Sequence, residues 1–269
     1  MNPKTTLQYL QACESTMNVL LHVLACGAYW ASRSQSEVFC QSVKRLADGY
    51  GDGDSWLGLN LRGYPALLAF YPTGLVSVAQ GDHRMLERLL TMMIRVERNK
   101  CEKSIIMSLS PCTILRRDLQ QQLLPGRERE FTPLSNHVFE VLRDPLRDYL
   151  PDDNAYDQAF DWFEYLSALV HCDRTITPEQ IERANSGATD WCVGGPVGRF
   201  LWNRRDSDDS ILARTRVGGS EGYPAIVAAI LRIGLFRSVS NALNWDHFQL
   251  VKQAFDRFVV AQRNAMGVY

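Results

Sequence analysis

Two apolar segments joined by a short polar turn place the strongest constraint on how this chain can fold. They lie within residues 61–98, with Gln80-Gly81-Asp82 as the turn. Pro65 suits the first turn of a helix, where its missing N–H would have no partner in any case. Pro72 should kink or restart that helix, and Asp82 is a good N-cap for the next one. The stretch therefore predicts two helices folded against each other.

The second helix of this pair is predicted from apolar residues that recur at intervals of three and four. Such a pattern is typical of a helix with one buried face. Its members are Met85, Leu86, Leu89, Leu90, Met93 and Ile94. The pattern weakens after Arg98, and residues 105–107 fit either a short strand or a buried connector.

Helix start signals recur along the rest of the chain. Ser34 and Glu37 have the spacing of a capping box. Ser110-Pro111 predicts a helix through Leu123, and Ser135 is a candidate N-cap for the helix after it. The first helix should start near Thr5 or Thr6 and loosen at Gly27. These signals predict an all-α fold of roughly ten to twelve helices in irregular antiparallel pairs, similar to tetratricopeptide and other helical repeats.

An aromatic-rich helix is predicted over residues 155–170. It is apolar around much of its circumference, which is typical of a helix buried on several sides. Asp157, Asp161 and Glu164 would then lie on its polar face and reach solvent or a cleft, so that Glu164→Ala should leave folding nearly intact. The aromatic members are Tyr156, Phe160, Trp162, Phe163 and Tyr165.

The domain organisation is predicted to be a single helical domain over residues 1–269. A polar stretch near 124–133 is the one plausible seam within it. The tetrapeptide Gly63-Tyr64-Pro65-Ala66 occurs a second time as Gly222-Tyr223-Pro224-Ala225. If the two are equivalent parts of a helical-pair repeat, both should begin helices of similar direction.

Composition excludes several classes of protein. Hydrophobic residues make up 46% and charged residues 22% of the 269 residues, which is typical of a globular protein. The formal charge of -1 gives no bulk attraction to nucleic acid or anionic lipid. No apolar run reaches the ~18 residues of a membrane helix. Seven irregularly spaced cysteines, with no signal peptide pattern, suggest reduced thiols in a cytoplasmic protein.

Asp161, Glu164 and Arg199 are the candidate catalytic residues. The two acids share one helix face and could serve acid–base chemistry or metal binding, although a solvated polar face explains them equally well. Arg199 ends a glycine-rich stretch that could contact phosphate, but that stretch lacks the lysine of a P-loop. We expect a tight turn there, with Arg199 packed over Trp191 or Trp202.

Two histidine–cysteine pairs are further candidates, one for a metal site and one for a catalytic dyad. His22 and Cys26 have a spacing that suits two metal ligands, but nothing marks two further ligands, and burial in the core is the favoured interpretation. His171 and Cys172 are adjacent, and neighbouring helical residues point in different directions, which disfavours a catalytic dyad. The sequence therefore predicts no metal and no cofactor.

Five segments of the sequence carry a resemblance to known proteins: Gly27-Ala28-Tyr29-Trp30, Arg62-Gly63-Tyr64-Pro65-Ala66-Leu67-Leu68, His137-Val138-Phe139-Glu140-Val141-Leu142-Arg143, Phe163-Glu164-Tyr165-Leu166-Ser167-Ala168-Leu169-Val170 and Pro196-Val197-Gly198-Arg199-Phe200. In this order they resemble the helical C-terminal region of large bacterial proteins that act in anti-phage defence. The N-terminal parts of those proteins include sirtuin-like and Schlafen-type domains. The resemblance implies that the chain is a C-terminal piece or a stand-alone partner of such an effector, and it transfers no active-site residue.

The favoured function is a non-enzymatic interaction or sensing module that regulates an effector, with a protein partner or a covalently linked effector domain. Homo-oligomer formation is a further possibility. One alternative is an enzyme or nucleotide-binding domain that uses Asp161, Glu164 and Arg199. A weaker one is nucleic-acid sensing through arginine clusters at 116–117, 127–129 and 204–205. Binding that falls steeply with salt would favour the last alternative.

Overall fold

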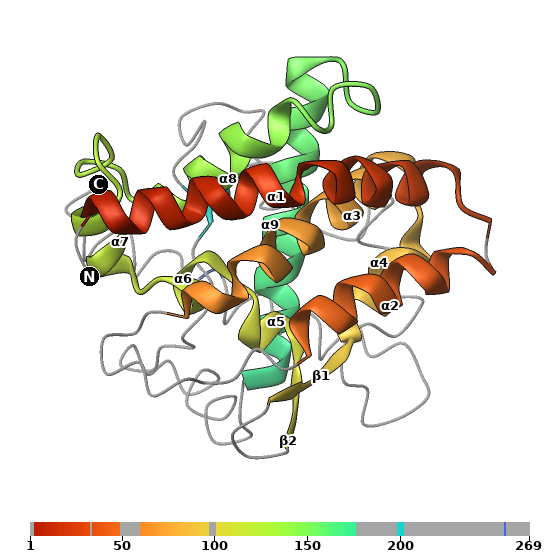
Figure 1. Cartoon of the computed structure of the whole chain (residues 1–269). Coiled ribbons are helices and arrows are strands. Elements are labelled where there is room, and N and C mark those ends of the chain that lie inside the picture. The colour runs from red at the N-terminus through yellow and green to blue at the C-terminus, as the bar shows by residue number, and fades with distance from the viewer. Residues whose placement is uncertain are drawn as a thin grey trace.

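The computed structural model describes residues 3–32, 34–48, 60–96, 101–175 and 198–201, together with residue 256. This part of the chain is mostly helical, as predicted, with nine α-helices, two 3-10 helices and one two-stranded sheet (Figure 1). In chain order the elements are α1 (Pro3–Trp30), α2 (Ser36–Ala47), η1 (Leu61–Gly63), α3 (Tyr64–Gln80), α4 (His83–Thr91), β1 (Met93–Val96), β2 (Cys101–Ser104), α5 (Ile105–Ser108), α6 (Pro111–Ile114), α7 (Arg117–Leu123), α8 (Pro133–Arg143), α9 (Asp153–Thr175) and η2 (Arg199–Leu201). Among these helices none is long and apolar enough to cross a bilayer.

Helix α3 is the centre of the core. It packs against α1, α2, α4 and α9, and most of its residues are buried. Pro65 lies in its first turn, as predicted. Pro72 lies inside the helix, which continues past it to Gln80, so the predicted restart is wrong. Gly81 ends α3 with a φ of 66°, a left-handed conformation that favours glycine, and donates its N–H to the last-turn carbonyls.

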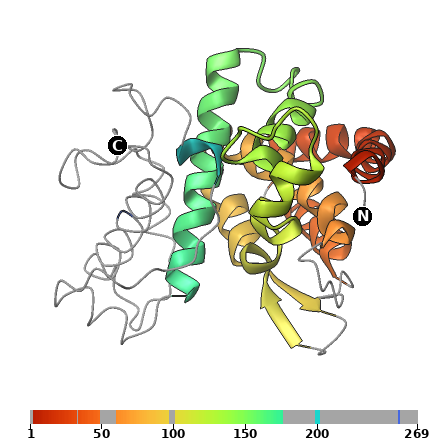
Figure 2. The ribbon, with the colours of Figure 1, turned by 90° about the vertical axis from the view of Figure 1, so that its left-hand side faces the viewer.

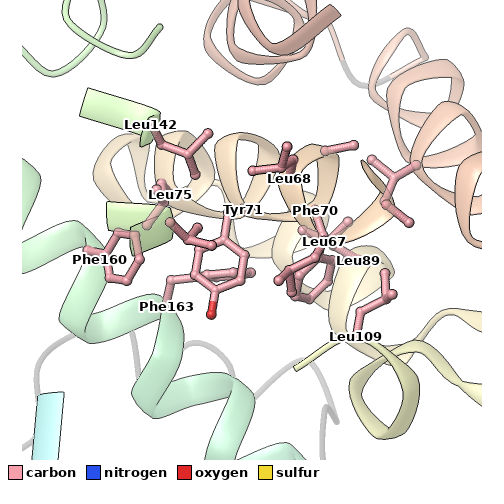
Figure 3. Packing of buried hydrophobic residues seen from close by; sticks show 14 of the residues in the cluster. Leu67, Leu68, Phe70, Tyr71, Leu75, Leu89, Leu109, Leu142, Phe160 and Phe163 are labelled. Carbon is pink, nitrogen blue, oxygen red and sulfur yellow. The ribbon is translucent and has the colours of Figure 1, made fainter. Parts of the chain in front are cut away.

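Helix α9 crosses α3 through a layer of aromatic rings (Figure 3). The centroids of Phe70 and Phe163 lie 5.0 Å apart, and those of Tyr71 and Phe160 lie 5.2 Å apart. A Cβ at Gly74 would come within 2.0 Å of the Phe163 ring, so a glycine allows this close approach. The prediction of a central helix buried on several sides is therefore confirmed.

The two helices expected within residues 61–98 are present, but the second ends earlier than predicted. Asp82 caps α4 by accepting the N–H of Met85, as expected. The chain then turns into β1, where Met93 pairs with Ser104 and Ile94 with Lys103. Ile94 is buried and Met93 is 40% exposed, which follows the alternation of a strand. The prediction that both continue the helical stripe is wrong, and residues 105–107 form helix α5.

The predicted capping box at Ser34 is absent. Helix α2 begins at Ser36, and its N-cap, Gln35, makes no side-chain cap bond. Glu37 instead lies 3.2 Å from Arg88 of α4, so a tertiary ion pair holds the carboxylate that the motif would have used. Helix α1 also departs from expectation because it continues through Gly27 to Trp30.

Ser110 begins a helix as predicted, by accepting the N–H of Thr113. That helix stops at Ile114, because Leu115 has extended backbone angles, and α7 follows as a separate helix. The buried side chain of Gln120 donates to the Leu115 carbonyl at 2.6 Å. This amide satisfies a backbone group that the break leaves without a helical partner.

The proposed seam near 124–133 is a loop between α7 and α8, and Arg127 ties it to Glu130 and Glu140. The first copy of the repeated tetrapeptide begins α3, as predicted. Its second copy, Gly222-Tyr223-Pro224-Ala225, lies outside the described residues.

Candidate functional site

Glu164 lies at the junction of four elements, and its side chain points into the protein rather than to solvent. The residue is 4% exposed, so its predicted place on a polar face is wrong. Three groups donate hydrogen bonds to its carboxylate: the Tyr71 hydroxyl at 3.0 Å, the Ser135 hydroxyl at 2.6 Å and the Arg199 backbone N–H at 2.8 Å. These donors come from α3, α8 and η2, so one buried carboxylate joins α9 to three other elements.

Ser135 has a different role from the N-cap that its sequence context suggests. Helix α8 begins at Pro133, and Thr132 is its N-cap. Ser135 therefore lies within the first turns, where its hydroxyl donates to Glu164 and accepts the Arg199 N–H at 3.1 Å. The hydroxyl connects α8 to both α9 and η2.

Gly198 allows η2 to approach this carboxylate. A Cβ at this position would lie 2.3 Å from Glu164 Oε2, well inside contact distance. The next residue, Arg199, then has its N–H directed at the same oxygen. Gly198 thus allows the backbone to come close to the Glu164 carboxylate. The glycine-rich sequence alone did not distinguish this role from that of a phosphate-binding turn.

Burial and hydrogen bonding act in opposite directions on the acidity of Glu164. Burial raises the pKa of the carboxyl above its usual value, although the Ser135 and Tyr71 hydrogen bonds and the Arg199 charge lower it. Burial also raises the pKa of Tyr71 far above its usual value, and the adjacent Glu164 charge adds to this effect. Tyr71 therefore keeps its proton and acts as a hydrogen-bond donor.

The Arg199 guanidinium is held by an aromatic ring and by acids of α9. Its central carbon lies 3.4 Å from the centroid of the Phe139 ring. Its Nη1 atom lies 3.2 Å from an oxygen of Asp157 and 3.9 Å from an oxygen of Asp161. The aromatic partners in the described structure are Phe139 and, at 5.5 Å, Phe160, whereas Trp191 and Trp202 lie outside the described residues.

The structure thus brings Asp161, Glu164 and Arg199 together, but it leaves little room beside them. A cavity of about 20 Å³ adjoins Glu164, between Tyr71, Ser167 and Gly198. That volume suits about one water molecule, whereas ligand pockets occupy about 300–1,000 Å³. Within the described residues, this arrangement is suited to holding η2 against the helices, and a substrate does not fit beside the carboxylate.

The two histidine–cysteine pairs also lack the features of active sites. Burial raises the pKa of Cys172 to about 12 and lowers that of His171 to about 4. At neutral pH the thiol keeps its proton and the imidazole is uncharged, so no thiolate nucleophile forms. Cys26 is exposed on α1, so the predicted burial is wrong. Among the described residues no cluster of three or more metal-binding side chains occurs.

A second polar junction was missed by the sequence analysis because its members are far apart in the chain. Glu14 of α1 accepts hydrogen bonds from Tyr64 of α3 at 2.8 Å and pairs with His137 of α8 at 2.7 Å. Burial alone would raise the pKa of Glu14, but these bonds and the His137 charge outweigh it and hold the pKa below its usual value. The pair fixes α1 to the core.

The outer face of α1 was also missed. Val19, Val23 and Trp30 are 75%, 49% and 73% exposed, and Val38 of the neighbouring α2 is 63% exposed. A groove of about 480 Å³ separates the C-terminal half of α1 from the start of α2. Its walls include Val23, Cys26, Trp30, Val38 and Phe39. The available signal was that α1 carries apolar residues on two opposite faces.

The arginine clusters are partly neutralised by acids. Arg116 pairs with Asp118 at 2.6 Å, and Arg127 pairs with Glu130 and Glu140. Arg204 and Arg205 lie outside the described residues.

Comparison with known proteins identifies no relative of this chain. No protein-family model matches the sequence, and neither the curated proteins nor the solved structures include a significant match.

Proposed function

We propose that this chain is a non-enzymatic helical interaction module that regulates an effector through protein contacts. The observation that carries the proposal is the exposed apolar surface of α1 and α2, with its groove of about 480 Å³. Exposed apolar side chains gathered beside a groove are typical of protein-binding surfaces. We define this surface by Val19, Val23, Trp30 and Val38 and call it the α1–α2 surface.

The hydrogen bonds and ion pairs of the candidate acids support a non-enzymatic function. Glu164 is committed to Tyr71, Ser135 and the Arg199 backbone, and Asp157 pairs with the Arg199 side chain. A general acid or base must reach its substrate within hydrogen-bond distance. The α1–α2 surface is the better candidate because it is accessible, whereas the acids serve the interior.

The setting follows from the resemblance to anti-phage defence proteins. The proposed effector is either a domain linked to this chain or a separate protein encoded beside it, in the bacterial cytoplasm. The helical-repeat arrangement belongs to the same proposal, because stacked helical pairs present extended binding surfaces. It requires Gly222-Tyr223-Pro224-Ala225 to begin a helix, as Gly63-Tyr64-Pro65-Ala66 does.

Co-purification with a protein encoded beside this chain, as the proposed effector, tests the proposal. The test variant is Val23→Glu, which places a charge on the α1–α2 surface. Gln11→Glu is the matched control, because it adds the same charge to an exposed position of the same helix. We expect the wild type and the control to retain the effector and Val23→Glu to lose it. Equal retention by all three forms would refute the role of this surface.

A further inference from the structure

Helix α1 carries a second stripe besides the one that enters the core. Its members follow one another at alternating intervals of four and three, the spacing of a coiled-coil seam. All of them are exposed, unlike the core-facing residues Leu10, Met17, Leu21, Leu24 and Ala28 of the same helix. We call this set the outer seam: Ala12, Thr16, Val19, Val23, Cys26 and Trp30.

The outer seam and the core stripe lie on opposite sides of α1. At about 100° per residue, the seam occupies one arc of the helix and the core residues occupy the arc facing it. Figure 2 shows α1 at one edge of the described structure, with α3 and α9 on its inner side. The seam therefore faces away from α3, while its members Val23, Cys26 and Trp30 border the groove beside α2.

Charged side chains are almost absent from α1. Lys4 and Glu14 are its two ionised residues, apart from the titratable His22. Glu14 is already bound to Tyr64 and His137. The interior of a protein interface is likewise depleted of charged residues, so the outer seam has the chemistry of a surface that another helix covers.

The order of side-chain sizes along the outer seam indicates which helix covers it. The seam begins with the small Ala12 and Thr16 and ends with the large Trp30. In an antiparallel pair of α1 helices centred on Leu21, Ala12 faces Trp30, Thr16 faces Cys26 and Val19 faces Val23. The large Trp30 then meets the small Ala12, and the other pairs match residues of similar size, which gives even packing along the pair.

A parallel pair fits less well. It would set Trp30 against Trp30 at one end and Ala12 against Ala12 at the other, so the helices would be held apart at one end and underpacked at the other. The seam is therefore complementary to itself in the antiparallel direction, as a two-fold interface requires.

We infer that this chain forms a two-fold symmetric dimer in which the outer seams of two α1 helices pack antiparallel. The inference rests on the proposed interaction function and names a second copy as the protein on the α1–α2 surface. Each groove between α1 and α2 then receives Ala12 and Thr16 of the other copy. The effector binds this dimer, so a chain that loses the dimer also loses the effector.

Disulfide trapping tests the register of this pair on the full-length chain. Thr16→Cys places a thiol opposite the native Cys26 of the other copy, so mild oxidation should give a covalent dimer through a 16–26 bond. The double variant Thr16→Cys with Cys26→Ala is the control and should not give this bond. A dominant Cys26–Cys26 bond in the wild type would establish the parallel pair and refute the inference.

Sedimentation equilibrium on the reduced chain, with no effector present, tests the dimer itself. We expect a concentration-dependent dimer whose dissociation constant rises at least about tenfold in Val23→Glu and stays unchanged in Gln11→Glu. A wild-type chain that is monomeric at the highest concentration would overturn the inference. If Val23→Glu nevertheless loses the effector, the proposed function stands and only the second copy as occupant is refuted.

Discussion

Replacing Glu164 by alanine is the sharpest test of how the second half of the chain is held together. The carboxylate is buried and accepts hydrogen bonds from Tyr71, Ser135 and the Arg199 backbone. Alanine removes all three acceptor contacts and leaves the hydroxyls of Tyr71 and Ser135 without this acceptor, while the Arg199 N–H keeps its bond to the Ser135 hydroxyl. Each buried polar group left without a partner costs about 1–3 kcal/mol.

The expected loss of unfolding free energy is about 3–5 kcal/mol, within the roughly 2–6 kcal/mol that two buried hydroxyls without a partner cost together. The loss should not reach the upper end of that range, because burial raises the pKa of Glu164 and the carboxylate therefore already carries an unfavourable desolvation cost. Glu164→Gln should cost only about 1 kcal/mol. Its amide can donate to the hydroxyls of Tyr71 and Ser135, which can also accept, while its oxygen keeps the Arg199 N–H.

Urea unfolding followed by circular dichroism measures these losses. The control is Glu37→Ala, which removes a half-exposed carboxylate paired with Arg88 at 3.2 Å and should cost about 0–1 kcal/mol. The melting temperature of Glu164→Ala should fall by roughly 10 °C. A loss for Glu164→Ala no larger than that of Glu37→Ala would refute the structural role of Glu164 and return it to the candidates for catalysis.

Three further predictions concern packing, pH and thiol chemistry. Gly74→Ala should cost about 1–3 kcal/mol in urea unfolding, because the new methyl group overlaps the ring of Phe163; an unchanged midpoint would contradict the close approach of α3 and α9. The lowered pKa of Glu14 gives stability that is present above the unfolded pKa of about 4.3 and is lost as pH falls through the folded pKa. In a pH series of urea midpoints, Glu14→Gln should therefore lose less stability on acidification than the wild type, and an equal loss would argue against the pair. Iodoacetamide should label the exposed Cys26 much faster than the buried Cys172, whose pKa is raised to about 12, as peptide mass spectrometry can show; comparable rates would contradict that burial.

Local sequence signals predicted the buried helix and the caps of α4 and α6, but not those of α2 and α8. Asp82 and Ser110 each accept an N–H at the start of a helix, as expected. These bonds join residues three apart, so the motif contains both partners. The aromatic residues of α9 were predicted to be buried because a helix apolar on most sides has no face to present to water.

Tertiary contacts decided the features that the sequence did not predict. Ser135 had the sequence context of a cap, yet its hydroxyl binds Glu164, which lies 29 positions later. Asp157, Asp161 and Glu164 looked like a solvated face because their partner, Arg199, lies 35 to 42 positions later in the chain. The hairpin of β1 and β2 was hidden because Ile94 fits a helical stripe and a strand equally well.

The outer face of α1 was overlooked for a related reason. Its core stripe alone accounts for the helical periodicity, so the second apolar stripe at the same spacing does not stand out in the sequence. Val19 and Val23 show that exposed apolar residues can follow the same spacing as buried ones. The exposed fraction of each side chain, which only the structure gives, distinguishes the outer stripe from the core stripe.

Hydroxyl-radical footprinting of Trp30 tests the central claim most directly, namely that protein covers the α1–α2 surface in the working assembly. Trp30 is 73% exposed in the described structure and Trp162 is 7% exposed, so Trp162 provides an internal reference. Mass spectrometry would compare both residues in the dilute chain and in the concentrated chain with its effector. The account predicts that oxidation of Trp30 falls several-fold on assembly while that of Trp162 stays low. Unchanged oxidation of Trp30 in the assembly would contradict the claim.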